Sequence, residues 1–245
     1  MATTVDMKAL FEAGVHFGHK SSHWNPKMSK YIHSKRQDDH IIDLAKTVEA
    51  LNIALPFLSK VSASGKKILF VSTKKPTKNL VRATAEATDQ PYMVERWLGG
   101  TLTNVSTIGQ QIKKLKDLEK RMLSGDLEKR YSKLEVQRFQ EEIDSLNIKY
   151  GGIKDLNGTP GAIFVTDAIG DLNAIKEAKK MGILVVAIVD TNADPSLVDY
   201  VIPGNDDAIK GISLILEYVK SAINNGVNAS KKVVEKNDKK EVGEK

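Results

Sequence analysis

Histidines and carboxylates are the residues of this chain whose types and spacing could do chemistry. His16, His19 and His23 lie close together near the N-terminus, whereas Asp190 and Asp206 come late in the chain, at the ends of predicted strands or loops. Two imidazoles and two carboxylates can satisfy a zinc ion, so His16, His19, Asp190 and Asp206 form a candidate metal site. The simpler alternative is that the histidines pack or donate hydrogen bonds, because histidine spacing alone is a weak signal. No cofactor is required on that interpretation.

Sequence signatures of enzymes are missing. The chain contains no cysteine, which excludes disulfides, thiol nucleophiles and thiolate metal sites. It has no GxxxxGK[ST], no GxGxxG after a strand, no HExxH and no GxSxG, so the usual phosphate, dinucleotide, zincin and serine-nucleophile sites are absent. One enzyme interpretation stays open, in which the segment 73–79 binds a phosphorylated small molecule and His16 or His19 acts as acid–base. It lacks an activated nucleophile.

Positive charge is concentrated in two stretches. The chain has 37 Lys and Arg against 31 Asp and Glu, a net charge of +6. Residues 13–37 and 50–85 contain no acid, and they hold 5 + 7 = 12 Lys and Arg. Ordinary solvated surfaces mix the two signs, so this segregation favours a polyanion as partner. The candidate RNA contacts are Lys20, Trp24, Lys27, Lys30, Lys35, Arg36, Lys74, Lys75, Lys78, Arg82 and Arg96.

Two helix openings differ in their expected response to phosphate. TKKPTKN (73–79) follows a predicted strand and opens a helix, so its backbone N–H groups and lysines can receive phosphate oxygens. Asp206 and Asp207 stand at the start of the last helix, where they complement its dipole and should repel phosphate. ERWLGGTLTN (95–104) offers Arg96 and hydroxyl donors, and its Trp97 is expected to pack rather than stack on a base.

Apolar patterning predicts an α/β fold. The runs 68–73, 162–167 and 183–190 are fully apolar, as expected for buried strands of a parallel sheet. Helical patterns accompany them at 77–88, 171–181 and 205–223, and shorter strands are expected at 92–94 and 200–202. A short helix capped by Asp6 and a longer one from Asp43 to about Ser62 flank a stretch without clear pattern. Alternating strands and helices indicate a doubly wound, mostly parallel sheet.

Residues 103–150 interrupt this alternation. Apolar residues recur there at three- and four-residue spacing on both sides of Gly125, except that Glu119 occupies one seam position. This predicts an antiparallel helical hairpin of coiled-coil type, inserted between strands. The predicted units are a discontinuous α/β domain with a basic N-terminal segment (1–102 with 151–225), the hairpin (103–150) and a charged, disordered tail (226–245). A coiled-coil scaffold that binds other proteins through this hairpin is a third interpretation of function.

No membrane segment is expected. The first residues do not read as a signal peptide, and no apolar run approaches the roughly 20 residues that cross a bilayer. We therefore expect a cytoplasmic protein.

Several motifs in order resemble the bacterial small-subunit ribosomal protein S-two family. They are AGVHFGH (13–19), WNPKM (24–28), HIIDLAKTV (40–48), ILFVSTK (68–74), RWLGGTLTN (96–104), GGIKDL (151–156), AIVDTNADP (187–195) and VIPGNDDAI (201–209). The resemblance implies a flavodoxin-like domain with a protruding coiled-coil hairpin. It also implies a structural, ribosome-associated role: the protein would bind small-subunit rRNA, contact other small-subunit proteins and help dock ribosomal protein S-one. We expect no small-molecule substrate and no obligate homo-oligomer.

Overall fold

The computed structural model describes residues 4–242, and the side chains of residues 4–230. A five-stranded sheet lies at its centre, with the order β5-β4-β6-β7-β8 and all neighbouring strands parallel. Numbered along the chain, this is the order 2-1-3-4-5 of flavodoxin-like doubly wound sheets. The strands are β4 (Ile68–Val71), β5 (Tyr92–Met93), β6 (Ala162–Val165), β7 (Leu184–Val189) and β8 (Tyr200–Pro203). The predicted α/β class and all five predicted strands are confirmed.

Helices cover both faces of this sheet, which explains why its strands are fully apolar. Successive side chains of a strand point to opposite faces: Phe70 of β4 belongs to one buried cluster and Leu69 to the other. The first cluster includes side chains of α2 (Leu44–Ala63), α3 (Lys78–Ala87) and α8 (Ile209–Val242), and the second those of α7 (Leu172–Lys180). The carboxyl ends of the strands therefore meet at one edge, where polar residues follow them.

The N-terminal segment is more ordered than its sequence indicates. After α1 (Met7–Glu12), which the Asp6 side chain caps through the Lys8 N–H at 2.8 Å, the chain forms a second sheet. Its antiparallel strands are β1 (Phe17–Lys20), β3 (Asp39–Ile42) and β2 (Ile32–Arg36), in that order, with the 3₁₀ helix η1 (Pro26–Tyr31) between β1 and β2. The prediction of an irregular stretch was wrong because these strands are only four or five residues long and contain several polar residues, so no long apolar run marks them.

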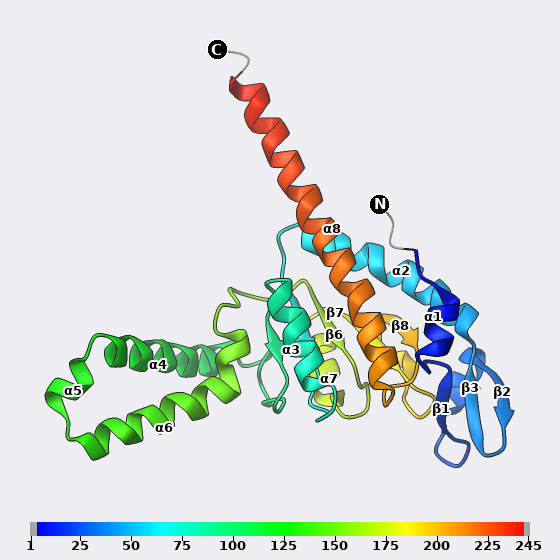
Figure 1. Cartoon of the computed structure of the whole chain (residues 1–245), viewed down its shortest axis with the longest axis horizontal. Helices are drawn as coiled ribbons and strands as arrows, with labels where there is room; N and C mark the ends of the chain where they lie inside the picture. Colours follow the sequence, from blue (N-terminus) through cyan, green and yellow to red (C-terminus); the bar gives the residue numbers. More distant parts are fainter. Residues whose placement is uncertain (1–3, 243–245) are drawn as a thin grey trace.

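A helical arm leaves the central sheet after β5 and returns to it before β6. It consists of α4 (Val105–Leu123), the short α5 (Asp126–Arg130) and α6 (Lys133–Tyr150), followed by the 3₁₀ helix η2 (Gly151–Ile153). Figure 1 shows the arm projecting from one end of the molecule, with the small antiparallel sheet at the other end. Leu115 and Leu118 of α4 pack with Ile143 and Leu146 of α6 in a separate buried cluster. The regular packing of a coiled coil stays a prediction.

Polar contacts explain the charged residue in the seam of the arm. The carboxylate of Glu119 accepts a hydrogen bond from Asn147 Nδ2 at 2.9 Å and lies 3.5 Å from Lys154 Nζ. Gly125 adopts a positive φ of 68° where the chain turns into α5, which is the turn that its position predicts.

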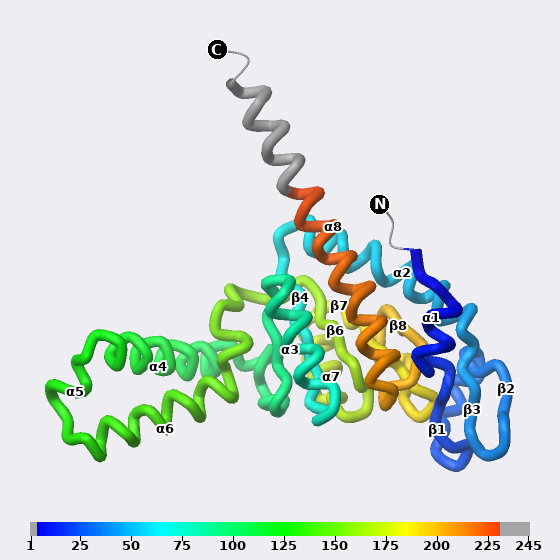
Figure 2. The backbone as a smooth tube through the Cα atoms, viewed as in Figure 1, coloured from blue at the N-terminus to red at the C-terminus, as the bar shows by residue number. Residues whose placement is uncertain are grey.

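Helix α8 continues past the predicted start of the tail. It packs along α2, and a Cβ built on Gly226 would lie 2.2 Å from the carbonyl oxygen of Ser59. Figure 2 shows the described part of α8 crossing α2. Residues 226–230 are thus helical, and glycine at 226 permits the close contact between the two helices. The disorder predicted for 231–245 lies outside the residues whose side chains are described.

Candidate nucleic-acid interface and the sheet-edge cluster

Carboxylates gather around one lysine at the carboxyl edge of the central sheet. Lys74 follows β4, Asp167 follows β6, and Asp206 and Asp207 follow β8. The Lys74 ammonium lies 2.7 Å from Asp207 Oδ1, 3.0 Å from Asp206 Oδ1 and 4.0 Å from Asp167 Oδ2. The helix openings expected to attract and to repel phosphate thus lie side by side. Lys74 offsets part of the charge of these carboxylates and is not available to phosphate in this arrangement.

The charges of this sheet-edge cluster shift one another's pKa. Burial lowers the pKa of Lys74, but hydrogen bonds to Asp207 and Asp206 outweigh it and raise the pKa overall. Burial raises the pKa of Asp206 to about 6, and repulsion from Asp167 and Asp190 adds to the effect. Asp171, at the start of α7, also has a pKa raised to about 6 by burial, although it accepts hydrogen bonds from the hydroxyl and N–H of Thr73.

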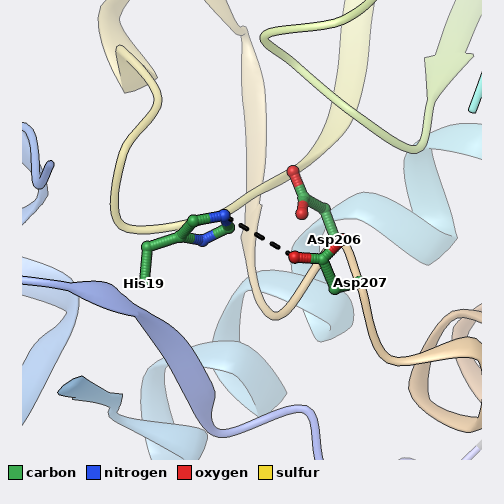
Figure 3. Close-up of side chains that lie close together, drawn as sticks. All are labelled: His19, Asp206 and Asp207. Carbon is green, nitrogen blue, oxygen red and sulfur yellow. Dashed lines mark ion pairs between the residues drawn. The ribbon is translucent and has the colours of Figure 1, made fainter.

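His19 joins the small sheet to the same edge. Its Nδ1 lies 3.1 Å from Asp190 Oδ2 and its Nε2 lies 3.6 Å from Asp207 Oδ2; Figure 3 shows the imidazole facing Asp207 beside Asp206. Its backbone N–H donates to Thr191 Oγ1 at 2.9 Å. The hydrogen bond to Asp190 raises the pKa of His19, with burial opposing it.

Of the four predicted metal ligands, His19, Asp190 and Asp206 come together, and His16 does not. Donor atoms of His19 and Asp206 lie within 4.8 Å of each other and of Asp207, which was not predicted. Asp190 contacts the same imidazole. His16 is buried instead between two phenylalanines, with its ring centroid 4.4 Å from that of Phe11 and 4.1 Å from that of Phe17.

Packing explains this change in the predicted donor set. Burial lowers the pKa of His16, as expected for an imidazole packed against phenylalanine rings. His16 therefore leaves the predicted ligand set, and Asp207 is the donor that the sequence reasoning missed.

Ion pairs also engage part of the second basic stretch. Lys78 Nζ lies 2.8 Å from Glu95 Oε2, and an Arg82 guanidinium nitrogen lies 3.1 Å from Glu95 Oε1. The hydrogen bond from Lys78 is the largest cause of a lowered pKa at Glu95. Lys75 and Arg96 are exposed and have no ion pair within the described residues. The stretch is therefore less free to bind phosphate than its charge count indicates.

The N-terminal basic segment divides in the same way. Lys27 pairs with Asp194 at 2.7 Å, and Lys35 lies 3.9 Å from Asp38. Lys30 lies 4.8 Å from the ring centroid of Tyr31. The half-buried Trp24 packs with its ring centroid 5.0 Å from that of His40. Among the predicted contacts of this segment, those that are exposed and have neither an ion pair nor a ring contact with a described residue are Lys20 and Arg36.

One carboxylate fixes the loop that precedes the arm. Glu177 of α7 accepts hydrogen bonds from Trp97 Nε1 at 3.0 Å, from the Gly100 N–H at 2.8 Å and from the Leu102 N–H at 3.1 Å. Thr103 adds its N–H and hydroxyl. Burial by itself would raise the pKa of Glu177, but these donors lower it overall.

The loop's donors that were candidates for phosphate therefore serve the fold. Trp97 is buried, which confirms that it packs at the base of the arm. The sequence reasoning missed Glu177 because it lies 74 residues from Thr103 and belongs to no local motif.

Comparison with known proteins decides the family. The family model described as "Ribosomal protein S2" matches residues 10–226. The chain is 47% identical over 226 residues to the small ribosomal subunit protein uS2 of Marinobacter nauticus, and equally to that of Hahella chejuensis. Each alignment covers 92% of this chain and 89% of the relative. The chain belongs to the ribosomal protein S2 family.

Membership in the S2 family confirms the resemblance found in the sequence. It makes the chain a structural protein of the small ribosomal subunit, with a role in translation, and not an enzyme. The enzyme interpretation of residues 73–79 is therefore wrong. The structure gives a physical reason: Lys74, which would have bound the phosphate, already contacts three carboxylates at the sheet edge. Within the residues that the structure describes, no helix is both long and apolar enough to cross a membrane.

Proposed function

We propose that this S2-family protein binds small-subunit rRNA through exposed cations of the small antiparallel sheet and of the central domain. The observation that carries the proposal is the division between paired and unpaired basic residues. Four predicted contacts are exposed and have neither an ion pair nor a ring contact within the described part of the chain; they are Lys20, Lys75, Arg36 and Arg96. These four can neutralise phosphates without breaking an internal pair.

The expected mechanism is electrostatic. Cations that meet RNA phosphates release condensed counterions, and each contact adds about 0.7–0.9 to the slope of log affinity against log salt. Four such contacts predict roughly a 100-fold loss of affinity between about 50 and 200 mM salt. Lys74, Lys78 and Arg82 should contribute less, because each already pairs with a carboxylate.

A matched pair of double variants tests this mechanism. Lys20→Ala with Arg36→Ala removes two unpaired cations, and should make the salt slope shallower by roughly 1.4–1.8. Lys176→Ala with Lys180→Ala removes the same charge from α7, outside both acid-free stretches, and should leave the slope nearly unchanged. Affinity for purified small-subunit rRNA, measured over a salt series, gives both slopes. Equal slopes for the two double variants would contradict the proposal.

The family resemblance supports the finer parts of the proposal. They are a cytoplasmic ribosomal location, a coiled-coil arm lying across the subunit surface, and help in docking ribosomal protein S-one alongside other small-subunit proteins. The separate buried cluster of the arm supports its role as an independent projection. Small subunits assembled without this protein should lose S-one, as measured by quantitative mass spectrometry of gradient fractions. Undiminished S-one in those fractions would remove docking from the function.

A zinc site at the sheet edge is a second candidate. It is favoured by the clustering of His19, Asp206 and Asp207, with Asp190 on the same imidazole, since imidazole nitrogen and carboxylate oxygen are zinc ligands. Lys74 is its competitor, because its ammonium contacts both Asp206 and Asp207. Calorimetric titration with zinc should show binding that His19→Ala abolishes and Lys74→Ala strengthens. Equal binding by all three proteins would exclude this site.

A further inference from the structure

A pocket of about 400 Å³ lies where the arm meets the central domain. We call it the arm-root pocket. Its lining comes from α3, from the segment after β5, and from the end of α6 with η2. Four cationic side chains and one carboxylate line it: Arg82, Arg96, Lys149, Lys154 and Glu95. A hollow with this balance is suited to an anion.

The carboxylate does not cancel the charge of this pocket. Glu95 is already paired with Lys78 and Arg82, and Lys154 lies 3.5 Å from Glu119. Arg96 and Lys149 are exposed and have no ion pair to any described residue. Two cations are therefore free to act together on one ligand.

One guanidinium that lines the pocket has a donor without a partner. The Nε of Arg82 is buried and has no hydrogen-bond partner, although the rest of its guanidinium contacts Glu95 and lies 5.8 Å from the ring centroid of Tyr92. A buried, unpaired N–H is costly. Arginine N–H groups match the oxygens of a phosphate, which can accept several hydrogen bonds.

We propose that the arm-root pocket binds a backbone phosphate of RNA, and that this contact fixes the direction of the arm. The proposal rests on the rRNA binding proposed above and deepens it. Arg96 belongs to the central domain and Lys149 to the end of α6, so one phosphate between them joins the two parts. RNA is favoured as the source of the phosphate because both free cations are exposed, where a large polyanion can reach them.

In this arrangement, phosphate binding and the angle of the arm are thermodynamically linked. A phosphate that needs both Arg96 and Lys149 binds best when the arm lies at the angle that brings them together, so RNA shifts the arm toward that angle. The loop held by Glu177 anchors the α4 side of the root to α7. The phosphate supplies the equivalent anchor on the α6 side, and both helices of the arm are then tied to the body.

Spin-label distances in the full chain test this inference. The sequence contains no cysteine, so Leu123→Cys on the arm and Asn52→Cys on α2, both at exposed positions, give one label each. Distances are measured by pulsed electron paramagnetic resonance, with and without purified small-subunit rRNA. We expect rRNA to narrow the distance distribution of the otherwise unchanged protein.

Two double variants then locate the effect. With Arg96→Ala and Lys149→Ala, saturating rRNA should no longer narrow the distribution, and the salt slope should be about 0.7–0.9 shallower, the value for one lost phosphate contact. Lys113→Ala with Lys120→Ala removes the same charge from exposed positions on α4, and should behave like the parent. The exchange Arg96→Lys with Lys149→Arg keeps both charges and should retain the narrowing.

The outcomes separate this inference from the function on which it rests. If the double variant Arg96→Ala with Lys149→Ala still shows the rRNA-induced narrowing of the distance distribution and the parent's salt slope, the phosphate site in the arm-root pocket is overturned, but rRNA binding is not. Absence of salt-dependent rRNA binding in the parent would overturn the proposed function together with this inference. Narrowing produced by inorganic phosphate alone, at an equal phosphate concentration, would overturn the assignment to RNA.

Discussion

The sheet-edge cluster and the arm-root pocket both lie after strands of the central sheet, and both contain basic residues from the same acid-free stretch. At the sheet edge, Lys74 is enclosed by Asp167, Asp206 and Asp207 and stabilises the fold. At the arm root, Arg96 and Lys149 form no ion pair with a carboxylate in the described part of the chain, because Glu95 pairs with Lys78 and Arg82 instead. The comparison teaches that the position of the acids, supplied by distant parts of the chain, decides which lysines and arginines can serve a polyanion.

Removing the carboxylate that holds the arm root should have the largest effect on stability. Glu177→Ala leaves the donors of Trp97, Gly100 and Leu102 without their acceptor, and unpaired buried donors cost about 1–3 kcal/mol each. We expect a loss of about 3 kcal/mol in the free energy of unfolding, measured by urea denaturation. Glu177→Gln retains an acceptor oxygen and should lose less. A loss below about 1 kcal/mol for the alanine variant would show that this carboxylate does not hold the arm root.

The second prediction concerns the pH dependence of stability at the sheet edge, where Asp171 has a raised pKa. A carboxyl whose folded pKa is raised binds its proton more tightly in the folded state, so its contribution to stability falls as the pH rises from about 4 to 6. For Asp171, whose pKa is about 6, the span is at most roughly 3 kcal/mol. Asp171→Asn should therefore stabilise the protein relative to the parent more at pH 7 than at pH 4, as followed by urea midpoints. A difference independent of pH would contradict the raised pKa.

Two adjacent lysines allow the sharpest test of paired against unpaired charge. Lys74→Ala leaves buried carboxylates uncompensated and should cost about 2 kcal/mol of unfolding free energy, with little change in the salt slope of rRNA binding. Lys75→Ala should change stability by less than about 0.5 kcal/mol, but make the salt slope shallower by about 0.7–0.9. Urea denaturation and rRNA titration of both variants measure the two properties. The reverse pattern would break the comparison.

The smallest effect is expected from releasing two basic residues from their ion pairs with Glu95. Glu95→Gln removes the charge that engages Lys78 and Arg82 beside the arm-root pocket. Exposed ion pairs contribute only about 0.2–1 kcal/mol, so the protein should remain folded with slightly lower stability. Its rRNA affinity at low salt should rise by roughly two- to fivefold, because two more cations become available. An unchanged or weaker affinity would show that these cations do not face RNA.

The strands of the central sheet were predictable because a parallel sheet that is covered on both faces requires an apolar residue at every position of a strand. β4 and β6 are apolar at each position and fully buried, and their ends were predicted within two residues. The strands of the small sheet are four or five residues long and only β3 shows alternating burial, which is too short a pattern to separate from a loop. The central fold was thus readable, and the N-terminal sheet was not.

For the sheet-edge cluster, the sequence predicted which charged residues follow the strands, but not which of them form ion pairs with one another. Lys74 and Asp206 are 132 residues apart, and no local pattern states that the ends of β4 and β8 bring them together. The same limit applied to the candidate metal ligands: His19 lies beside Asp206 and Asp207, whereas His16 packs between two phenylalanine rings. Side-chain direction and long-range contact decide these questions, and both are properties of the folded chain.

The insertion of the arm also has a consequence for how quickly the chain folds. Ile68 of β4 pairs with Ala162 of β6, a separation of 162 − 68 = 94 residues, and such distant pairing slows folding because the intervening loop must first be closed. The helices of the arm are local and bury their own cluster, so they can form early and bring residues 105 and 150 near each other. Early formation shortens the loop that remains. Stopped-flow refolding of Leu118→Ala should then be slower than that of the parent, so the arm would assist the sheet before it meets any partner.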